Sequence, residues 1–404
     1  MASAPSDSCP ATAATLPPGR LSHRQGFVLL ASIVISLLAA SAAPSPLYGL
    51  YREAWSFSAL MLTFVFAVYA FALLCGLLVF GALSDHVGRR PVLLAALVLE
   101  LGSLVLFWLA DSVAWLLAAR LLQGLATGIA TATLSAALLD LQRERGALVN
   151  SVAPMLGMAA GALGASAVVQ FAPQPAHLVF EALAALLALQ TVAAFYLPAT
   201  NQPRTGAWAS LRPSLAIPKS TLPTLLSILP MNTAQWALSG FYMSLGPTLA
   251  RHVSGINAPM LGGGLIATLV LSGAAGILWL RVLPARRVLS GSAAVLIAGL
   301  AVTLWGIQAH AVGPLFVGTA IAGAGFGAGF NASIRSLVPL APAEQRGAMM
   351  ASFFVLSYLA FSVPALAAGM AVGLFGLEAT ALGYVFVLIV LCGGAGIKLF
   401  ARKT

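Results

Sequence analysis

Ten residues between two long apolar stretches gather charges that are scarce in the rest of the chain. Residues 81–90 read GALSDHVGRR. The candidate residues among them are two glycines and three charged residues: Gly81, Asp85, Gly88, Arg89 and Arg90. A carboxylate can meet the positive N-terminal end of another helix, and guanidinium groups can pair with acids such as Asp140 or Glu144. Glycine permits close backbone approach and unusual backbone angles. The pattern favours an electrostatic connection between helices, whereas an ordinary basic loop would explain only the two arginines.

A second group of candidates lies inside an apolar stretch. Arg120, Gln123 and Thr127 follow helical spacing and therefore share one face of a helix. The same face includes Thr131 and Ser135. If this stretch spans a membrane, a central Arg costs at least about 2.5 kcal/mol to insert, and such residues usually face a cavity. We expect this face to line a central cavity. The alternative is that Arg120 extends its head group to the membrane surface.

A third set of polar side chains falls on one face of a predicted helix over residues 222–246. These residues are Asn232, Gln235, Trp236, Ser239 and Tyr242. Hydrogen-bonding groups beside aromatic rings are typical of small-molecule sites, and they can equally hold neighbouring helices together. Asn331 and Tyr358 are further candidates for a substrate cavity, while Arg335 is expected to reach the membrane surface.

Few carboxylates are placed to carry a proton inside a membrane. A proton carrier requires a carboxyl in a dry environment, and residues 27–50 contain no acid at all. Glu100 lies near the middle of an apolar stretch, where a lipid-facing carboxylate would be unfavourable. Glu181 and Glu53 lie near the ends of such stretches, and we expect them to be solvated. No acid is therefore assigned as the carrier.

No grouping of residues indicates an enzyme, a metal site or a cofactor. The sequence has no Ser/His/Asp grouping, no metal-ligand spacing and no nucleotide-binding loop, because GAGFGAGF at residues 323–330 follows no strand. Cys9, Cys75 and Cys392 are far apart, so no disulfide framework is expected.

The composition requires that these side chains be positioned by helices in a membrane. The 404 residues are 60% hydrophobic and only 7% charged, whereas a soluble domain is about 25% charged. Apolar runs of about 20 residues then predict helices that cross the hydrocarbon core. The net charge of +10 is explained by basic loops on the cytoplasmic side, and no nucleic-acid partner is expected.

We predict an all-α membrane protein with twelve transmembrane helices. The spans cover residues 27–50, 58–82, 91–110, 113–138, 147–171, 177–197, 222–246, 258–280, 288–308, 312–338, 348–373 and 379–400. The polar, proline-rich linker at 198–221 divides them into an N-terminal half, 27–197, and a C-terminal half, 222–400. Residues 1–26 are predicted to be a disordered cytoplasmic tail, and 401–404 a short cytoplasmic end. Residues 27–43 imitate a secretory signal, but we interpret them as the first helix, which the bundle needs.

The distribution of basic residues predicts the orientation. If the N-terminus is cytoplasmic, all but four of the 20 Lys and Arg residues lie in cytoplasmic segments. Arg52 and Arg251 fall outside, and Arg120 and Arg335 fall within spans. This asymmetry places both termini in the cytoplasm and supports an even number of spans.

An internal repeat relates the two halves. RGALVNS begins at Arg145 and RGAMMAS at Arg346, an offset of 346 − 145 = 201 residues. At the same offset Gly124 corresponds to Gly325. Two six-helix halves related by duplication are typical of transporters with a site between the halves.

At this point the chain resembles the transporters of the major facilitator superfamily. GALSDHVGRRP matches the family's loop signature, G-x-L-x-D-x-x-G-R-R/K, between the second and third spans. RLLQGLATG at residues 120–128 resembles the R-x-x-Q-G signature of proton-coupled exporters. GMAAGALGAS at 157–166 resembles the glycine-rich antiporter signature, with Ala162 where that signature has Pro; Pro154 lies earlier.

The resemblance implies roles for several residues. Asp85 would meet the start of the eleventh span near Gly347, so that the loop forms a conformational clasp between the halves. Arg120, with Gln123 and Gly124, would serve proton coupling or bind a substrate charge.

We therefore expect a monomeric, multi-pass transporter in the plasma (inner) membrane, surrounded by lipid. It would export drugs or metabolites by alternating access, driven by the proton gradient and without a cofactor. Uptake or efflux of a sugar or organic acid is the alternative, with Arg120 binding a substrate anion. A non-transporting membrane sensor on the same fold would need no intact loop and no charge in the cavity.

Overall fold

The computed structural model describes residues 21–201 and 204–401, and this part of the chain is built from helices without strands. The helices are α1 His23–Ala42, α2 Pro44–Trp55, α3 Ala59–Phe80, α4 Leu83–Val87, α5 Arg89–Trp108, α6 Val113–Leu141, α7 Arg143–Phe171, α8 Pro175–Ala194, α9 Ala207–Ser210, α10 Leu222–Ser254, α11 Pro259–Leu280, α12 Ala285–Gln308, α13 Val312–Leu337, α14 Arg346–Phe375 and α15 Leu377–Ala401. Two short 3-10 helices, η1 Val338–Leu340 and η2 Ala343–Gln345, precede α14.

The prediction of a twelve-helix membrane bundle is confirmed. Among the described residues, eleven helices are long and apolar enough to cross a membrane, with α1 and α2 counted together as one span. The twelfth is α10, which has 33 residues and carries the polar face over 222–246. That polar face, together with Pro230 and Pro247 inside the helix, explains why α10 is less apolar than the others.

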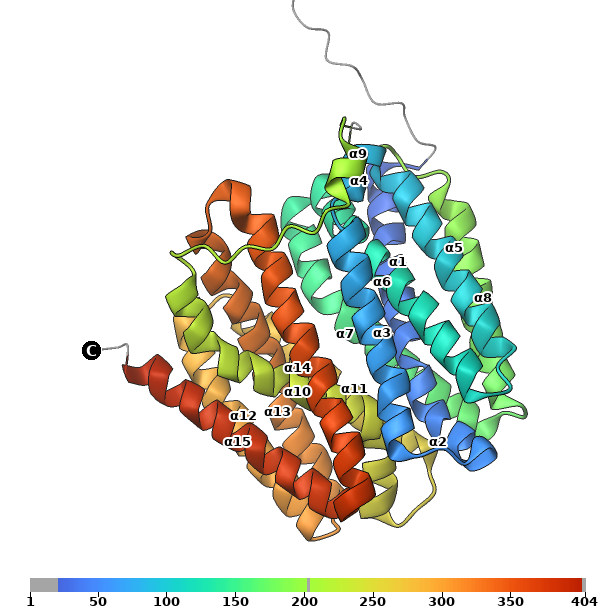
Figure 1. Cartoon of the computed structure of the whole chain (residues 1–404), viewed down its shortest axis with the longest axis vertical. Coiled ribbons are helices and arrows are strands. Elements are labelled where there is room, and N and C mark those ends of the chain that lie inside the picture. Colours follow the sequence, from blue (N-terminus) through green and yellow to red (C-terminus); the bar gives the residue numbers. More distant parts are fainter. Residues whose placement is uncertain (1–20, 202–203, 402–404) are drawn as a thin grey trace, which may run out of the picture.

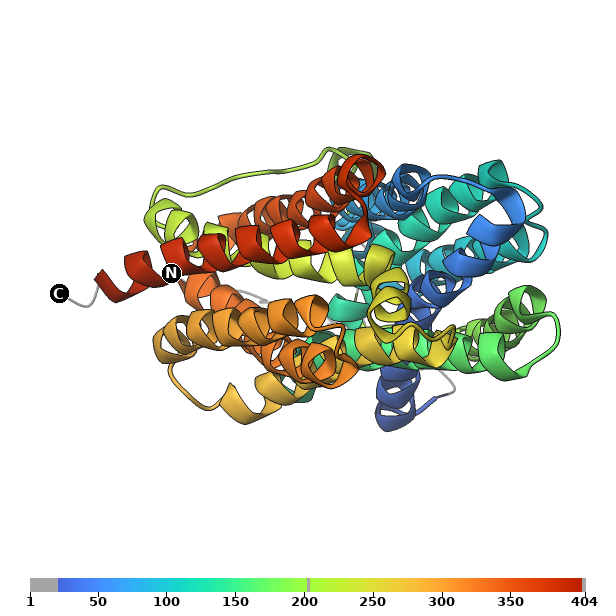
Figure 2. The same ribbon diagram turned by 90° about the horizontal axis from the view of Figure 1, so that it is seen from below.

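The bundle consists of two groups of helices that lie side by side. Figures 1 and 2 show α1–α8, coloured blue to green, beside α10–α15, coloured yellow to red. The groups pack chiefly through α3 against α14 and α7 against α11. A Cβ atom at Gly263 of α11 would lie only 2.5 Å from the Ala162 carbonyl oxygen of α7, so glycine is needed for this close approach.

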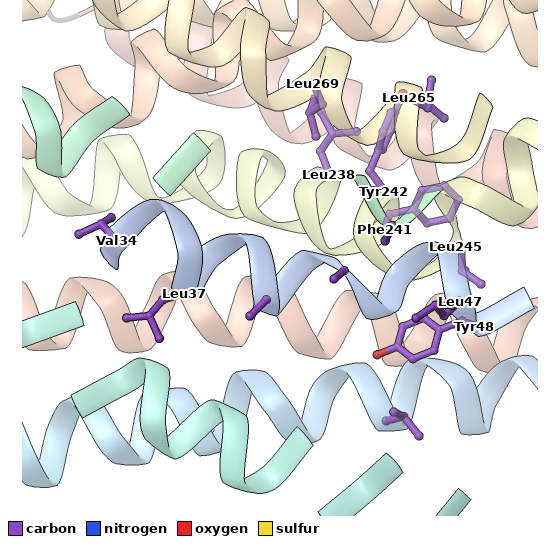
Figure 3. Close-up of a cluster of buried hydrophobic side chains, with 14 of the residues drawn as sticks. Val34, Leu37, Leu47, Tyr48, Leu238, Phe241, Tyr242, Leu245, Leu265 and Leu269 are labelled. Atoms are coloured by element: carbon purple, nitrogen blue, oxygen red, sulfur yellow. The ribbon is translucent and has the colours of Figure 1, made fainter. Parts of the chain in front are cut away.

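The first span is interrupted but remains helical. Pro44 occupies the first position of α2, where its missing N–H leaves no hydrogen bond unmade. The chain therefore continues as a helix to Trp55 and carries Tyr48 into the core. Figure 3 shows Leu47 and Tyr48 of α2 near Leu245 of α10, and all three belong to one buried cluster that joins the two groups of helices.

The two ends of the bundle are distinguished by their loops. We call the end that carries α4 and α9, at the top of Figure 1, the α4 end, and the opposite end the α2 end. Between α4 and α5, Gly88 adopts φ 107°, a backbone conformation that side chains other than glycine rarely adopt. This turn directs Arg89 back toward α4 and α6.

The predicted chain ends lie partly outside the described residues. Of the predicted tail, residues 1–20 are outside them, and so are residues 402–404 of the C-terminal end. Ser22 caps α1 by accepting a hydrogen bond from the Gln25 backbone N–H, so α1 begins at His23 and residues 23–26 are helical.

Candidate functional site

A buried guanidinium group is the centre of the candidate site. Arg120 is fully buried in α6. Its Nε donates to the Tyr48 hydroxyl at 2.7 Å, and its Nη1 donates to the Ser41 carbonyl oxygen at 2.9 Å and to Gln123 Oε1 at 2.7 Å. These bonds join α6 to α1 and α2. A charge taken out of water in this way is stabilised only by such partners.

The site continues to a buried carboxyl group that the sequence did not assign. Glu100 of α5 is fully buried, and its Oε1 accepts a hydrogen bond of 3.1 Å from Gln123 Nε2. The same nitrogen donates to the Ala40 carbonyl oxygen at 3.2 Å. Gln123 therefore connects the only guanidinium and the only carboxyl group that are buried among the described residues.

At each end of this series of hydrogen bonds, one side-chain atom has no hydrogen-bond partner. Glu100 Oε2 and Arg120 Nη2 are buried and have no hydrogen-bond partner among the described residues. A buried polar atom without a partner is costly, so each such atom requires an explanation. The Glu100–Gln123–Arg120 series is thus incompletely satisfied at the two charged groups. We call Glu100, Gln123, Arg120, Tyr48 and Ser41 the buried polar network.

Aromatic rings surround the guanidinium group. The Arg120 Cζ atom lies 5.2–5.6 Å from the ring centroids of Tyr48, Tyr69 and Phe107, within the range of cation–π attraction. Tyr69 of α3 also donates its hydroxyl to Ser41 Oγ at 2.9 Å. Tyr69 therefore contacts the network through both its ring and its hydroxyl.

Tyr69 belongs as well to an aromatic cluster between the two groups of helices. We define this interface aromatic cluster as Phe66, Tyr69, Trp236, Tyr358 and Phe361. The Phe66 and Phe361 rings, from α3 and α14, are 4.8 Å apart, and the Trp236 and Tyr358 rings are 4.9 Å apart. Trp236 and Tyr358 remain partly exposed. The cluster thus places aromatic side chains from both groups of helices at the boundary between them.

One member of this cluster has an unpaired polar atom. Within the described part of the chain, Trp236 Nε1 is buried without a hydrogen-bond partner, and so are Ser362 Oγ, Asn232 Oδ1 and Gln235 Oε1 on the same two helices, α10 and α14. Apolar and aromatic walls with a few polar groups are what a small-molecule site provides.

Three predicted cavity residues of α10 are held by neighbouring helices. Asn232 Nδ2 donates to Ser357 Oγ of α14 at 3.0 Å, and Gln235 Nε2 donates to the Gly325 carbonyl oxygen of α13 at 3.3 Å. The Tyr242 and Thr319 hydroxyls are 2.8 Å apart. Their placement matches the alternative in which polar groups hold helices together, whereas Trp236 lies in the aromatic cluster.

The remaining candidates of α6 and α13 lie in two different places. Thr127 is buried and donates to the Gln123 carbonyl oxygen at 2.8 Å. A Cβ atom at Gly124 would be 2.3 Å from the Tyr69 carbonyl oxygen, so Gly124 lets α6 pack closely on α3. Asn331 Nδ2 donates to Ser151 Oγ of α7 at 3.4 Å, a bond between the two groups of helices. Of the predicted α6 face, Arg120, Gln123 and Thr127 are enclosed in this structure rather than exposed to a cavity.

The loop residues meet within their own half. Arg89 pairs with Asp85, and its Nε donates to Asp140 Oδ2 of α6 at 3.1 Å, while Arg90 is exposed. Gly81 has ordinary helical backbone angles. The ion pair that the structure gives Asp85 is with Arg89 and not with the beginning of α14.

The linker connects this loop to the second half instead. The Arg204 backbone N–H donates to the His86 carbonyl oxygen at 3.1 Å, close to the α4 loop. Farther along, Ser352 Oγ of α14 donates to the Ala216 carbonyl oxygen at 3.1 Å, and Ser220 Oγ donates to the Leu340 carbonyl oxygen at 2.9 Å. The linker thus lies against both halves at the α4 end.

A cavity of about 260 Å³ lies between the halves at the α2 end. It is lined by α2, α7, α10 and the start of α11, and Tyr48 forms part of its wall. Across it, Arg251 Nη1 of α10 pairs with Glu53 Oε1 of α2 at 2.8 Å. Tyr48 therefore belongs both to the buried polar network and to the wall of a cavity that the two halves share.

The sequence does not single out several of these residues, for a physical reason. Glu100 is recognisable as an intramembrane acid, but its partner Gln123 lies 23 positions away, and periodicity within one helix cannot pair them. Ser41, Tyr48 and Phe66 carry no pattern that distinguishes them from other core residues. The cost of burying an acid was the one signal that could have selected Glu100.

The chain resembles known proteins in both its sequence and its structure. The family model of the Major Facilitator Superfamily matches residues 28–284, more than half of the chain. No curated protein sequence matches it. A mutant of the nucleoside transporter NupG superposes with a TM-score of 0.70 at 12% identity, covering 95% of this chain and 99% of that one. The human organic anion transporter MFSD10 (TETRAN) gives 0.66 at 20% identity, covering 93% and 100%. At these identities the structural likeness establishes the fold alone.

Proposed function

Because the chain belongs to the Major Facilitator Superfamily, we propose that it is a proton-coupled exporter of small amphipathic organic solutes. The observation that carries the proposal is the buried polar network, which joins Glu100 to Arg120 and touches the interface aromatic cluster through Tyr69. The proton site and the solute site would thus be in contact through one side chain, that of Tyr69. The proton gradient supplies the driving force, and no cofactor takes part.

Glu100 is the proposed proton carrier. Burial favours the neutral form of its carboxyl group, while the nearby guanidinium group of Arg120 favours the charged form. Loss of the proton would strengthen the attraction between Glu100 and Arg120 and draw the guanidinium group away from Tyr48 and Ser41. Gain of the proton would release it again. The protonated and deprotonated states would thus differ in the hydrogen bonds between α6 and α1–α2, so that the network would act as a two-state element.

The solute would bind at the interface aromatic cluster. Its rings supply apolar surface from both halves, and Trp236 Nε1 and Ser362 Oγ supply polar atoms that the described residues leave unpaired. Movement of Arg120 displaces its cation–π contact with Tyr69, whose ring is part of the cluster. Solute and proton would therefore compete through Tyr69, as exchange requires.

Alternating access would use contacts at both ends of the bundle. In this structure the Arg251–Glu53 ion pair joins the halves at the α2 end. In the opposite state we propose that this pair separates and that Asp85 leaves Arg89 to meet the N-terminal end of α14. The loop would then act as the clasp that the family resemblance implies.

We further propose the orientation and the assembly. The α4 end and both chain termini face the cytoplasm, as the distribution of Lys and Arg favours. The protein works as a monomer in the plasma (inner) membrane, in contact with lipid. Transport rather than catalysis is its activity.

Carriage of an organic anion is the second candidate. It is favoured by Arg120 Nη2, a buried cationic donor without a partner among the described residues. The structural neighbour MFSD10 is an organic anion transporter. An anion would need to reach Arg120 past Tyr48 or Tyr69, so it would require a wider opening than an aromatic solute at the cluster.

Transport by the purified protein in liposomes tests the proposal. A panel of amphipathic cations, neutral aromatic metabolites, sugars and organic acids is offered with and without a pH gradient, while a trapped dye reports proton movement. We expect an amphipathic solute to drive protons across the membrane. Gradient-driven transport of a sugar or organic acid alone would replace the proposed substrate class.

Two matched carboxyl variants test the carrier. Glu100→Gln keeps the shape of the side chain but cannot release a proton, so solute exchange should persist while proton movement falls at least about tenfold. Glu181→Gln is the control, because Glu181 is exposed and only accepts a hydrogen bond from Trp108 Nε1. Unchanged proton movement in Glu100→Gln would remove Glu100 from the mechanism.

A further inference from the structure

Three metal-ligating side chains converge at the α2 end, away from the buried polar network. His252 lies in the last turn of α10, His310 in the turn between α12 and α13, and Glu378 in the first turn of α15. His252 Nε2 is 3.3 Å from Glu378 Oε2, and His310 Nε2 is 3.7 Å from the same oxygen. One ligand atom from each of the three lies within 4.8 Å of the others.

From this convergence we propose that His252, His310 and Glu378 form a binding site for a zinc-class divalent metal ion. Zinc binds imidazole nitrogen and carboxylate oxygen at about 2.0–2.2 Å in tetrahedral geometry, which puts neighbouring ligand atoms roughly 3.3 Å apart. Two of the three separations already approach this value. Only the two imidazoles need to move closer, and their side chains are 40% and 52% exposed, so that little packing opposes a rotation.

The chemistry of the donors selects the metal. Two His and one Glu are a donor set that zinc uses, with water in the fourth position. Imidazole disfavours magnesium and calcium, which prefer oxygen ligands. The second oxygen of Glu378 remains available, so the carboxylate can bind through one or both oxygens.

Local helix electrostatics does not explain the whole arrangement. An acid in the first turn of α15 and a His in the last turn of α10 each suit the helix dipole. His310 directly follows the C-terminal end of α12, at the left-handed position of its cap, and the helix dipole does not explain why all three side chains converge on one point. Its backbone has φ 46°, a conformation uncommon for residues with a side chain. This turn brings the His310 ring to 5.7 Å from the His252 ring, so that both imidazoles meet the same carboxylate.

A bound ion would tie together three segments of the second half. It would join α10, which lines the shared cavity, to the α12–α13 turn and to α15. The ligands lie 58 and 68 positions apart (310 − 252 and 378 − 310), so no metal-binding spacing appears in the sequence. The site is independent of the proposed transport chemistry and can be tested without a substrate.

Metal binding to the full-length purified protein, without an affinity tag and stripped with a chelator, tests the site. Cobalt(II) is added as a spectroscopic probe, and zinc is titrated in competition with a chromophoric chelator. We expect one equivalent of cobalt with the visible absorption of a four-coordinate ion, displaced by zinc. Glu378→Gln and His310→Ala should each weaken zinc binding at least about tenfold.

His177→Ala is the matched control, because His177 is also exposed at this end but packs edge-on against Trp108. It should bind zinc like the unaltered chain. The melting temperature without metal reports whether each variant is folded. Absence of zinc binding at micromolar concentration would overturn the proposal. So would binding that survives in Glu378→Gln and His310→Ala, or that falls equally in His177→Ala.

Discussion

At the residue scale, Arg120 depends on neighbours that differ in how they hold it. The Tyr48 hydroxyl accepts a hydrogen bond from Arg120 Nε at 2.7 Å. Gln123 Oε1 accepts from Arg120 Nη1, and Gln123 Nε2 donates to Glu100 Oε1. Tyr48 belongs to α2 and Glu100 to α5, so the guanidinium group lies between two segments that the chain separates widely. Changing one hydroxyl therefore tests how much of the network depends on α2.

Tyr48→Phe should destabilise the protein measurably. It removes the acceptor for Arg120 Nε but keeps the ring, and a hydrogen bond to a charged group contributes about 1.5–3 kcal/mol. The expected loss in unfolding free energy is of that size, measured by thermal or denaturant unfolding in detergent. The guanidinium group would also be freer to approach Glu100.

Tyr51→Phe is the control for this change. Tyr51 lies three residues further along α2 and is buried, but its hydroxyl has no hydrogen-bond partner among the described residues. Its ring stacks on Trp55 with or without the hydroxyl. The change should leave the stability unaltered or raise it, because it removes a buried hydroxyl that has no hydrogen-bond partner. Equal losses in both variants would contradict the importance of the Tyr48 bond.

At the element scale, close contact between α3 and α6 places Tyr69 over Arg120. The approach depends on Gly124, where a Cβ atom would meet the Tyr69 carbonyl oxygen at 2.3 Å. Gly124, which follows Gln123 in the family signature, thus allows close packing of α6 on α3. It affects Arg120 indirectly, through the position of the Tyr69 ring.

Gly124→Ala should therefore separate α3 from α6 and impair function. Overpacking of a tight core costs about 1–3 kcal/mol, and displacement of Tyr69 should reduce coupled proton movement in liposomes. Gly164→Ala provides the comparison, because Gly164 is an exposed position of α7 with no atom near an added Cβ. It should be neutral or stabilising by up to about 1 kcal/mol. A stable and fully coupled Gly124→Ala protein would show that the contact is not needed.

At the scale of the whole molecule, the two ends of the bundle are held by different kinds of contact. An exposed ion pair, Arg251–Glu53, joins the halves at the α2 end, while the linker lies against both halves at the α4 end. Exposed ion pairs contribute about 0–1 kcal/mol. The α2 end can therefore open without a large barrier from this pair.

Arg251→Ala and Asp85→Asn should shift the opening in opposite directions. The first removes the ion pair at the α2 end and should favour opening there, by no more than about fivefold. Asp85→Asn removes the carboxylate that we propose to hold the α4 end closed while the α2 end is open. It should therefore disfavour opening at the α2 end. A cysteine replacing Ser244, which lines the shared cavity, reports the opening as its rate of labelling by a water-soluble maleimide.

Arg52→Ala is the control at the α2 end. Arg52 neighbours Glu53, but its Nε donates to the Phe57 carbonyl oxygen of its own half. Its loss should leave the labelling rate unchanged. Faster labelling in both Arg251→Ala and Asp85→Asn would contradict the clasp.

The amino-acid sequence by itself determined the class of fold and the position of nearly every long helix. A chain with 60% hydrophobic residues must take lipid as its solvent, and helix length is then set by the membrane. The family signatures are likewise local, so GALSDHVGRR and RLLQGLATG could be recognised without a structure. Arg120 stood out because burying a charge is costly wherever its partners lie.

Only the tertiary structure decided which of these side chains meet. Glu100 and Gln123 come from different helices, and so do Tyr69 and Trp236, Asn232 and Ser357, and the three ligands of the proposed metal site. The periodicity of a helix shows which residues share a face, but not which neighbour that face touches. Partnership between distant segments depends on packing of whole helices, and for that reason Asn232 and Gln235 proved to bind other helices while Glu100 joined the site.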